Sequence, residues 1–184
     1  PVAAIRQVLD TFGSQSSDNP GRLMVRTLGD VTLVMDYAHN PDGMAALCRT
    51  AAALPAVRRL LLLGQAGNRD NVQWQALARS AWEPQRFDRV VIKEMADMLR
   101  GREPGEVSAV LRDGLLEAGT PAEVISTASS ELDGVREALV WARAGDVLVL
   151  GVHVSRRDVL QLVDTMEANG WRAGDALPTV LPVA

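Results

Sequence analysis

The sequence predicts an α/β fold with a Rossmann-like, doubly wound and mostly parallel sheet, to which an N-terminal β-hairpin adds an antiparallel edge. Two observations support this fold class. Short runs such as RLLLL and DVLVLG are apolar throughout, which is typical of strands that helices cover on both faces of a sheet. Amphipathic stretches with the length of crossover helices separate these runs along the chain.

The elements can be placed in order from the amino terminus. An amphipathic helix is expected over 2–12, and a polar loop follows it. The β-rich runs RLMVRTL and VTLVMDY are joined by Gly29-Asp30, which predicts a hairpin. Asn40 is a good helix N-cap, and Pro41 suits a first helical turn. The remaining elements alternate, with helices expected at 41–54, 72–82, 105–118, 130–143 and 155–169 and strands at 59–63, 88–93, 122–126 and 146–151.

Length and composition are those of one soluble domain, which we place at 1–172, followed by a tail at 173–184. The 184 residues carry a net charge of −4, and this negative balance argues against non-specific nucleic-acid binding. No apolar run approaches the roughly 20 residues of a membrane span. The N-terminus also lacks the uninterrupted apolar region of a secretory signal. We therefore expect a cytoplasmic protein.

Lysine usage restricts how the protein can handle ATP. Lys93 is the only lysine, and Glu94 follows it, whereas a Walker A loop needs a lysine directly before Ser or Thr. If the protein uses ATP, another domain must therefore hold the β- and γ-phosphates. The sequence also begins at Pro1 rather than at a methionine, which suggests a piece of a longer protein.

Polar residues that can bind ligands cluster in the turns that follow the predicted parallel strands. In doubly wound sheets, ligands bind beyond the carboxyl ends of the strands, near the point where the strand order reverses. Both histidines, His39 and His153, and the single lysine fall in these turns, whereas the opposite turns look like plain connectors. The sequence therefore predicts one functional edge, formed by DYAHNPD, GQAGNRD, KEMADMLRGREPGE, STASSE and GVHVSRRD.

The stretch VMDYAHNPDG contains more polar groups than a helix cap requires. Capping explains Asn40, Pro41 and Asp42. It does not explain His39, or Asp36 at the end of an apolar strand. A carboxylate at a strand end can accept two ribose hydroxyls, and the following helix directs its positive N-terminus toward an anion. No CxxC pair and no second histidine at ligand spacing accompany this stretch, so we expect no metal site.

This stretch resembles the motif that opens the C-terminal domain of the Mur ligase superfamily of ATP-dependent amide-bond ligases. Upstream, Asn19-Pro20-Gly21-Arg22 matches the N-P-G-R turn of that family. Downstream, Lys93-Glu94, Leu99-Arg100-Gly101-Arg102 and Gly105-Glu106 are similar to a segment of the cyanophycin synthetases, the members that the chain resembles most. The resemblance extends over about 1–169.

The resemblance implies that this domain closes over a nucleotide bound chiefly by a neighbouring domain. In these ligases a central domain carries the Walker A loop, the Mg²⁺ ligands and catalytic residues. Arg22 and Asp36 match catalytic positions: the arginine reaches the ATP phosphates on closure, and the aspartate binds ribose hydroxyls or orients the arginine. Nucleotide binding is implied for Tyr37, His39, Asn40 and Pro41.

Two further turns are candidates for binding the amino substrate. A Gly-rich turn ending in Arg-Asp, as in GQAGNRD, recurs in the family, although its aspartate can equally cap the next helix. In KEMADMLRGREPGE, a lysine and two arginines can bind a carboxylate, while the acidic residues can instead receive a cationic side chain. A solvated loop is the alternative interpretation. The candidate substrate-binding residues are Asn68, Arg69, Asp70, Lys93, Glu94, Asp97, Arg100 and Arg102.

The chain departs from the family pattern in these loops. Cyanophycin synthetases are more acidic where this chain has Met95-Ala96, which weakens the expectation of arginine as the incoming substrate. The D-N-P-R signature of the diaminopimelate-adding muramyl ligase is absent. The turn GVHVSRRD lacks the G-K-G-H-E of muramyl ligases. We interpret Ser155 as a helix cap, and the alternative is that His153 lines the site with Arg156 and Arg157.

We therefore expect the C-terminal domain of an ATP-dependent carboxylate–amine ligase that acts through an acyl phosphate. ATP and Mg²⁺ would be bound mainly by the central domain, and the 184 residues alone should be inactive. The expected partners are ATP, an amino-acid or peptide substrate, and the N-terminal and central domains of the same protein, without nucleic acid or membrane. The alternative is a free-standing, non-catalytic α/β module that binds a nucleotide or a protein. A folylpolyglutamate-type ligase shares the Asp-x-Ala-His-Asn-Pro core but lacks support from the loop at 93–106.

Overall fold

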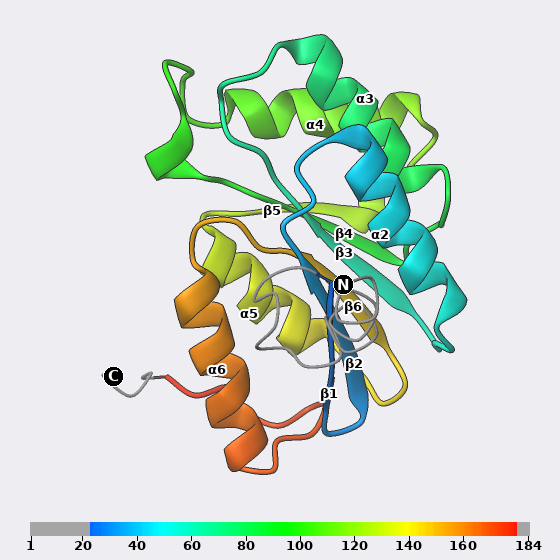
Figure 1. Cartoon of the computed structure of the whole chain (residues 1–184), viewed down its shortest axis with the longest axis vertical. Helices are drawn as coiled ribbons and strands as arrows, with labels where there is room; N and C mark the ends of the chain where they lie inside the picture. The colour runs from blue at the N-terminus through cyan, green and yellow to red at the C-terminus, as the bar shows by residue number, and fades with distance from the viewer. Residues whose placement is uncertain (1–22, 180–184) are drawn as a thin grey trace, which may run out of the picture.

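Six strands form one sheet in the computed structural model, which describes residues 23–179 (Figure 1). β1 pairs antiparallel with β2, and the other neighbouring strands are parallel, in the order β1-β2-β6-β3-β4-β5. The predicted fold class is therefore confirmed, including the hairpin at the antiparallel edge. The helix expected over 2–12 lies outside the described residues. The strands are β1 (Met24–Leu28), β2 (Val31–Asp36), β3 (Arg59–Leu63), β4 (Arg89–Lys93), β5 (Ile125–Ala128) and β6 (Val147–Gly151).

Helices cover both faces of this sheet (Figure 1). One face of the sheet packs against the first three described helices, and the other face packs against the last two. Every residue of the central strand β6 is therefore buried. None of the helices within 23–179 is long and apolar enough to cross a membrane. The helices are α2 (Pro41–Ala53), α3 (Asn71–Trp82), α4 (Glu106–Glu117), α5 (Glu131–Trp141) and α6 (Arg156–Ala168), with short 3₁₀ turns η1 (Ala96–Met98) and η2 (Ala122–Val124).

Side-chain caps begin two of the helices where the sequence places them. Asn40 and Asp70 each accept a backbone N–H from the residue three positions further on, at 2.8 Å. The expectation of a Ser155 cap is wrong. Ser155 occupies the N-cap position of α6, but its hydroxyl makes no capping bond, and its backbone N–H donates to Glu131 instead.

The strand expected at 122–126 begins later than predicted. Pro121 holds φ at −61°, and its carbonyl accepts the N–H of Val124 at 3.2 Å, which closes the turn η2. Residues that make such i→i+3 bonds cannot pair with β4 at the same time. The strand β5 therefore spans Ile125–Ala128.

The strand order reverses at β6, which lies between β2 and β3. The chain leaves β2 and β3 into helices on one face of the sheet and leaves β6 into α6 on the opposite face (Figure 1). Loops that diverge in this way open a crevice at the carboxyl ends of adjacent parallel strands. The topology therefore provides a binding crevice at the edge that the sequence predicts.

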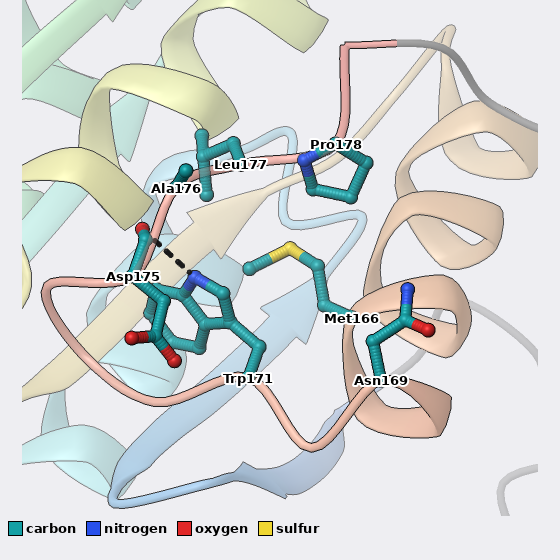
Figure 2. Close-up of a pocket in the computed structure, with 7 residues that line it drawn as sticks. All are labelled: Met166, Asn169, Trp171, Asp175, Ala176, Leu177 and Pro178. Carbon is teal, nitrogen blue, oxygen red and sulfur yellow. Dashed lines mark hydrogen bonds between the residues drawn. The ribbon is translucent and has the colours of Figure 1, made fainter.

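The segment after α6 packs at the other edge of the sheet. Figure 2 shows the indole N–H of Trp171 directed at the carbonyl oxygen of Asp175, at 3.1 Å, beside a hollow of about 260 Å³. The N–H of Ala173 donates to the carboxylate of Asp30, in the turn between β1 and β2. This segment thus secures the β1–β2 turn and leaves the carboxyl ends of the strands uncovered.

Gly29 is expected to tolerate a side chain poorly, because two constraints meet at this turn. Its φ is +59°, and an added Cβ would lie 2.4 Å from the carbonyl oxygen of Trp171. We expect Gly29→Ala to lower the free energy of unfolding by at least about 1 kcal/mol more than Gly170→Ala. Gly170 is a matched control because its φ is +64° and no atom lies within 4 Å of its added Cβ. Urea denaturation of both variants measures the difference, and equal losses would show that the close approach to Trp171 is not limiting.

Candidate functional site

A cleft of about 200 Å³ lies at the carboxyl ends of four parallel strands, and we call it the switch-point cleft. The turns that the sequence singles out after β2, β3, β4 and β6 converge on it, although they are far apart along the chain. Its lining residues are Tyr37, His39, Gln65, Ala66, Asn68, Arg69, Met95, Met98, Arg100 and His153.

The end of β2 separates this cleft from a second hollow of about 220 Å³, which we call the Asp36 hollow. Asp36 lines it together with Leu23 and, on α2, Gly43, Ala46, Leu47 and Thr50. The carboxylate of Asp36 is held in place because its Oδ2 accepts the backbone N–H of Leu23 at 2.6 Å. Arg22 precedes this residue in the sequence and lies outside the described residues.

Of the residues that follow Asp36, some line the switch-point cleft and others begin α2. Tyr37 and His39 line the switch-point cleft, and the ring centroid of Tyr37 lies 5.0 Å from that of His153 in an edge-to-face contact. The carbonyl oxygen of Ala38 faces Nε2 of His153 at 3.2 Å. Asn40 and Pro41 begin α2, and neither lines a hollow.

A fully buried ion pair lies directly behind the cleft wall. The ammonium of Lys93 contacts the carboxylate of Glu131 and also donates to the carbonyl oxygen of Gly151 at 2.6 Å. The side chains of both charged residues have no exposed surface. The Glu131 carboxylate also accepts three successive backbone N–H groups, at residues 153–155, at 2.7 to 3.1 Å. Every polar group of this pair is therefore satisfied, as buried charges require.

His153 links this pair to the cleft as a neutral imidazole. Its Nδ1 lies 2.9 Å from Nζ of Lys93, which can only donate, so Nδ1 accepts and Nε2–H donates to Ala38. Burial, together with the adjacent ammonium, lowers the pKa of His153 to about 4.

The two charges behind the wall have shifted pKa values for opposing reasons. Burial lowers the pKa of Lys93 to about 8, although Glu131 works in the opposite direction. Burial tends to raise the pKa of Glu131, but the charge of Lys93 and the hydrogen bonds outweigh it, so that this pKa is lowered. At neutral pH the lysine is therefore protonated, the glutamate ionised and the histidine neutral.

The loop after β3 approaches the next loop so closely that only glycine fits at one position. An added Cβ on Gly67 would lie 1.8 Å from the carbonyl oxygen of Leu99, and the Gly67 N–H donates to Met98 at 2.8 Å. This contact places Asn68 and Arg69 in the cleft wall. Asp70 caps α3, as the alternative reading of the turn GQAGNRD expects.

The three basic residues at the end of β4 and in the loop after it have different surroundings. Arg100 lines the cleft, from a left-handed backbone with φ of +53°. Arg102 pairs with Glu106 and stacks over Trp74, 4.8 Å from the ring centre. Lys93 is enclosed behind the wall.

Of the candidate site residues that the sequence names, the switch-point cleft therefore collects six: Tyr37, His39, Asn68, Arg69, Arg100 and His153. Asp36 lines the neighbouring hollow. Asn40, Pro41, Asp70, Lys93, Glu94, Asp97 and Arg102 line neither, and their contact with a ligand stays a prediction. Within 23–179, no group of three or more His, Cys, Asp or Glu residues could hold a metal ion.

The sequence places Gln65 and Glu131 in the turns GQAGNRD and STASSE of this edge, but it does not single out either residue as functional. Gln65 follows the Gly64 that ends the β3 run, a position that the strand-end rule already favours. Glu131 begins α5 directly after Ser130, where an acidic residue is expected for the helix alone. No local signal predicts that it binds a lysine 38 residues away.

Comparisons with known proteins agree with this architecture. The family of the Mur ligase, glutamate ligase domain matches residues 21–151. The cyanophycin synthetase of Crocosphaera subtropica is 34% identical over 122 residues, covering 66% of this chain and 14% of that protein. That of Trichormus variabilis is 31% identical over 156 residues, covering 84% and 17%. The chain thus spans less than a fifth of the length of these relatives.

Solved structures share the fold at lower sequence identity. A UDP-N-acetylmuramoyl-L-alanyl-D-glutamate–2,6-diaminopimelate ligase superposes with a TM-score of 0.62 at 19% identity, covering 89% of this chain and 36% of that chain. Escherichia coli FolC in complex with ADP superposes with a TM-score of 0.56 at 22% identity, covering 81% and 32%.

The His153 imidazole is expected to stay neutral, with its proton on Nε2, at pH values well below the ordinary histidine pKa of 6.5. Its titration midpoint should lie at about 4. The unfolded chain takes up this proton at the ordinary pKa, so it binds more protons than the folded chain between the two values. The free energy of unfolding should therefore fall as the pH drops through that window. Nitrogen-15 NMR of the ring gives the tautomer and the midpoint, and a midpoint near 6.5 would contradict the enclosure by Lys93.

Breaking the buried pair is expected to be costly. Lys93→Met and Glu131→Gln should each lower the free energy of unfolding by about 3–5 kcal/mol, because each leaves the other polar group buried without its partner. The double variant should lose at least about 1 kcal/mol less than the sum of the two. The exposed pair Arg79–Glu117, at 3.8 Å, is the control, and its variants Arg79→Met and Glu117→Gln should cost about 1 kcal/mol or less. Additive losses at Lys93 and Glu131 in denaturation experiments would contradict the coupling.

Proposed function

The chain belongs to the Mur ligase family of glutamate ligase domains, and on this premise we propose that it is the domain of an ATP-dependent amide-bond ligase that closes over the nucleotide and receives the amino substrate. In the reaction, ATP phosphorylates a carboxylate, and an amine then attacks the acyl phosphate with loss of phosphate. The contribution of this domain is to position groups, because orienting an amine against an activated acyl group accounts for much of such a reaction rate.

The observation that carries the proposal is the pair of hollows on either side of the end of β2. One presents the carboxylate of Asp36, and the other gathers polar and cationic side chains from four strand ends. A ligase of this kind must hold the nucleotide and the amine next to each other without mixing their binding groups. Two hollows separated by one strand end suit that requirement.

The Asp36 hollow is the proposed nucleotide side. The carboxylate of Asp36, fixed by the N–H of Leu23, is suited to accept ribose hydroxyls or to orient a guanidinium. We assign Arg22 to the ATP phosphates, where a guanidinium delivered by domain closure would neutralise charge on the transferring phosphoryl group. The N-terminus of α2, which follows this strand end, contributes a positive dipole.

The switch-point cleft is the proposed amine side. Arg69 and Arg100 supply positive charge there, and Asn68 supplies amide groups. The neutral His153 and the ring of Tyr37 form the wall toward β2 and β6.

ATP with Mg²⁺ requires groups that these 184 residues do not contain. Lys93 is the only lysine and is bound to Glu131, so no lysine is available for a Walker A loop. When bound, Mg²⁺ neutralises charge on the phosphates. The proposal therefore includes a neighbouring P-loop domain, and the printed chain alone should release no ADP.

The direct test is an amine screen with the protein in which this domain accompanies a P-loop domain. ADP release that depends on both a carboxylate and an amine, together with an amide product, is the expected result. Nucleotide binding without ADP release for any amine would instead favour the non-catalytic module.

Arg22→Ala and Asp36→Ala are each expected to lower ATP-dependent turnover in that protein at least tenfold, about 1.4 kcal/mol of barrier. Arg49→Ala and Asp113→Ala remove the same charges from exposed positions on α2 and α4, outside both hollows, and serve as controls. Turnover near the original level for Arg22→Ala or Asp36→Ala, with the fold intact by circular dichroism, would remove their assigned roles.

A further inference from the structure

Gln65 presents a buried hydrogen-bond donor that lacks an acceptor within the described residues. The residue is only 6% exposed and lines the switch-point cleft, and its Nε2 has no hydrogen-bond partner. A buried amide N–H is costly to leave unpaired, so such groups in folded proteins usually meet a partner. Nδ1 of His39, in the same wall, is likewise buried and unpartnered. Two residues that line one cleft thus each carry a buried polar atom without a partner, which favours a polar ligand there.

The charge of the cleft indicates which kind of ligand it receives. Arg69 and Arg100 are the charged side chains of its lining, and neither forms an ion pair with another described residue. His153 is neutral and adds no charge. Two unpaired guanidiniums beside an amide donor create a positive potential that attracts an anion and repels a cation.

The acidic residues of the neighbouring loop are not among the residues that line the cleft. Glu94 and Asp97 follow β4, but neither lines the cleft, and Asp97 is exposed. The carboxylate of Glu131 is already neutralised by Lys93, and that of Asp36 lines the neighbouring hollow rather than this cleft. A cationic side chain would therefore find no carboxylate among the lining residues.

We propose that Gln65 is a specificity-determining residue whose Nε2–H donates to a carboxylate of the amino substrate. We further infer that this substrate is an amino acid without a positively charged side chain. The inference rests on the proposed function and deepens it. The sequence of the loop after β4 is compatible with either an anionic or a cationic substrate group, and the inference selects the anionic one. Met95, Met98 and Ala66 provide apolar surface for the carbon skeleton.

Binding can be tested without turnover. In nitrogen-15 NMR of the 184-residue chain, the side-chain amide of Gln65 should shift saturably on titration with L-glutamate or L-norleucine. L-arginine should bind at least tenfold more weakly than either. Failure of all three amino acids to bind, or a preference for L-arginine, would overturn the proposal.

Substitution then tests the residue itself. Gln65→Glu keeps the shape but replaces the donor by a carboxylate, so it should weaken L-glutamate binding at least tenfold and improve L-arginine binding. Gln73→Glu makes the same change at an exposed position of α3 and should alter neither affinity. Gln65→Leu removes the donor without adding charge, and its L-glutamate affinity should also fall. Unchanged L-glutamate affinity in both Gln65 variants would overturn the assignment.

Failure of this inference can be told apart from failure of the proposed function. If the amine screen yields an amide of the carboxylate substrate with L-arginine, with ATP converted to ADP and phosphate, the ligase function stands and the inference is wrong. If L-glutamate binds through Gln65 but no amine supports ADP release, the inference about the cleft stands and the ligase function is wrong.

Discussion

The buried ion pair between Lys93 and Glu131 ties together the strand ends that form the functional edge. Lys93 ends β4, Glu131 begins α5, and their remaining hydrogen bonds reach the end of β6 and the backbone at 153–155. Two charges without exposed surface are costly to bury unless their polar atoms are paired, and here each has a partner. Gly64, directly after β3, leaves room for the Lys93 side chain, because an added Cβ at this position would lie 2.4 Å from Cγ of Lys93.

This arrangement also determines the charge that reaches the cleft. Because Glu131 neutralises the lysine, and because the ammonium keeps His153 neutral, the wall toward β6 presents hydrogen-bonding groups without net charge. The positive charge of the cleft then comes from Arg69 and Arg100. Arg102 follows Arg100 by two positions and donates to the carbonyl oxygen of Arg69. Its guanidinium pairs with Glu106 and stacks over Trp74. The discrimination that we propose at Gln65 follows from this distribution.

The position of the two hollows suits a domain that works against another one. Both lie at the carboxyl ends of the strands, and the segment after α6 packs at the opposite edge, against the turn between β1 and β2. Asp36, the last residue of β2, lines one hollow, and Tyr37 and His39, which follow it, line the other. In the ligase that we propose, a nucleotide held mainly by a neighbouring domain would approach one hollow while an amine occupies the other.

The sequence by itself determined the sheet, its antiparallel edge, the caps at Asn40 and Asp70, and the edge of the sheet on which the polar turns gather. These features depend on local patterns: apolar runs, turn residues, and side chains that bond to a backbone three residues away. Only the tertiary structure decided that Lys93 turns inward, that Arg102 stacks on Trp74, and that Glu131 accepts the backbone N–H groups of residues 153–155 before α6. Each of these choices joins residues that the chain separates widely, such as Lys93 and Gly151, 58 positions apart. The hydrogen-bond partner of a side chain at a strand end is a residue that becomes a neighbour only in the folded chain, so no local sequence pattern specifies it.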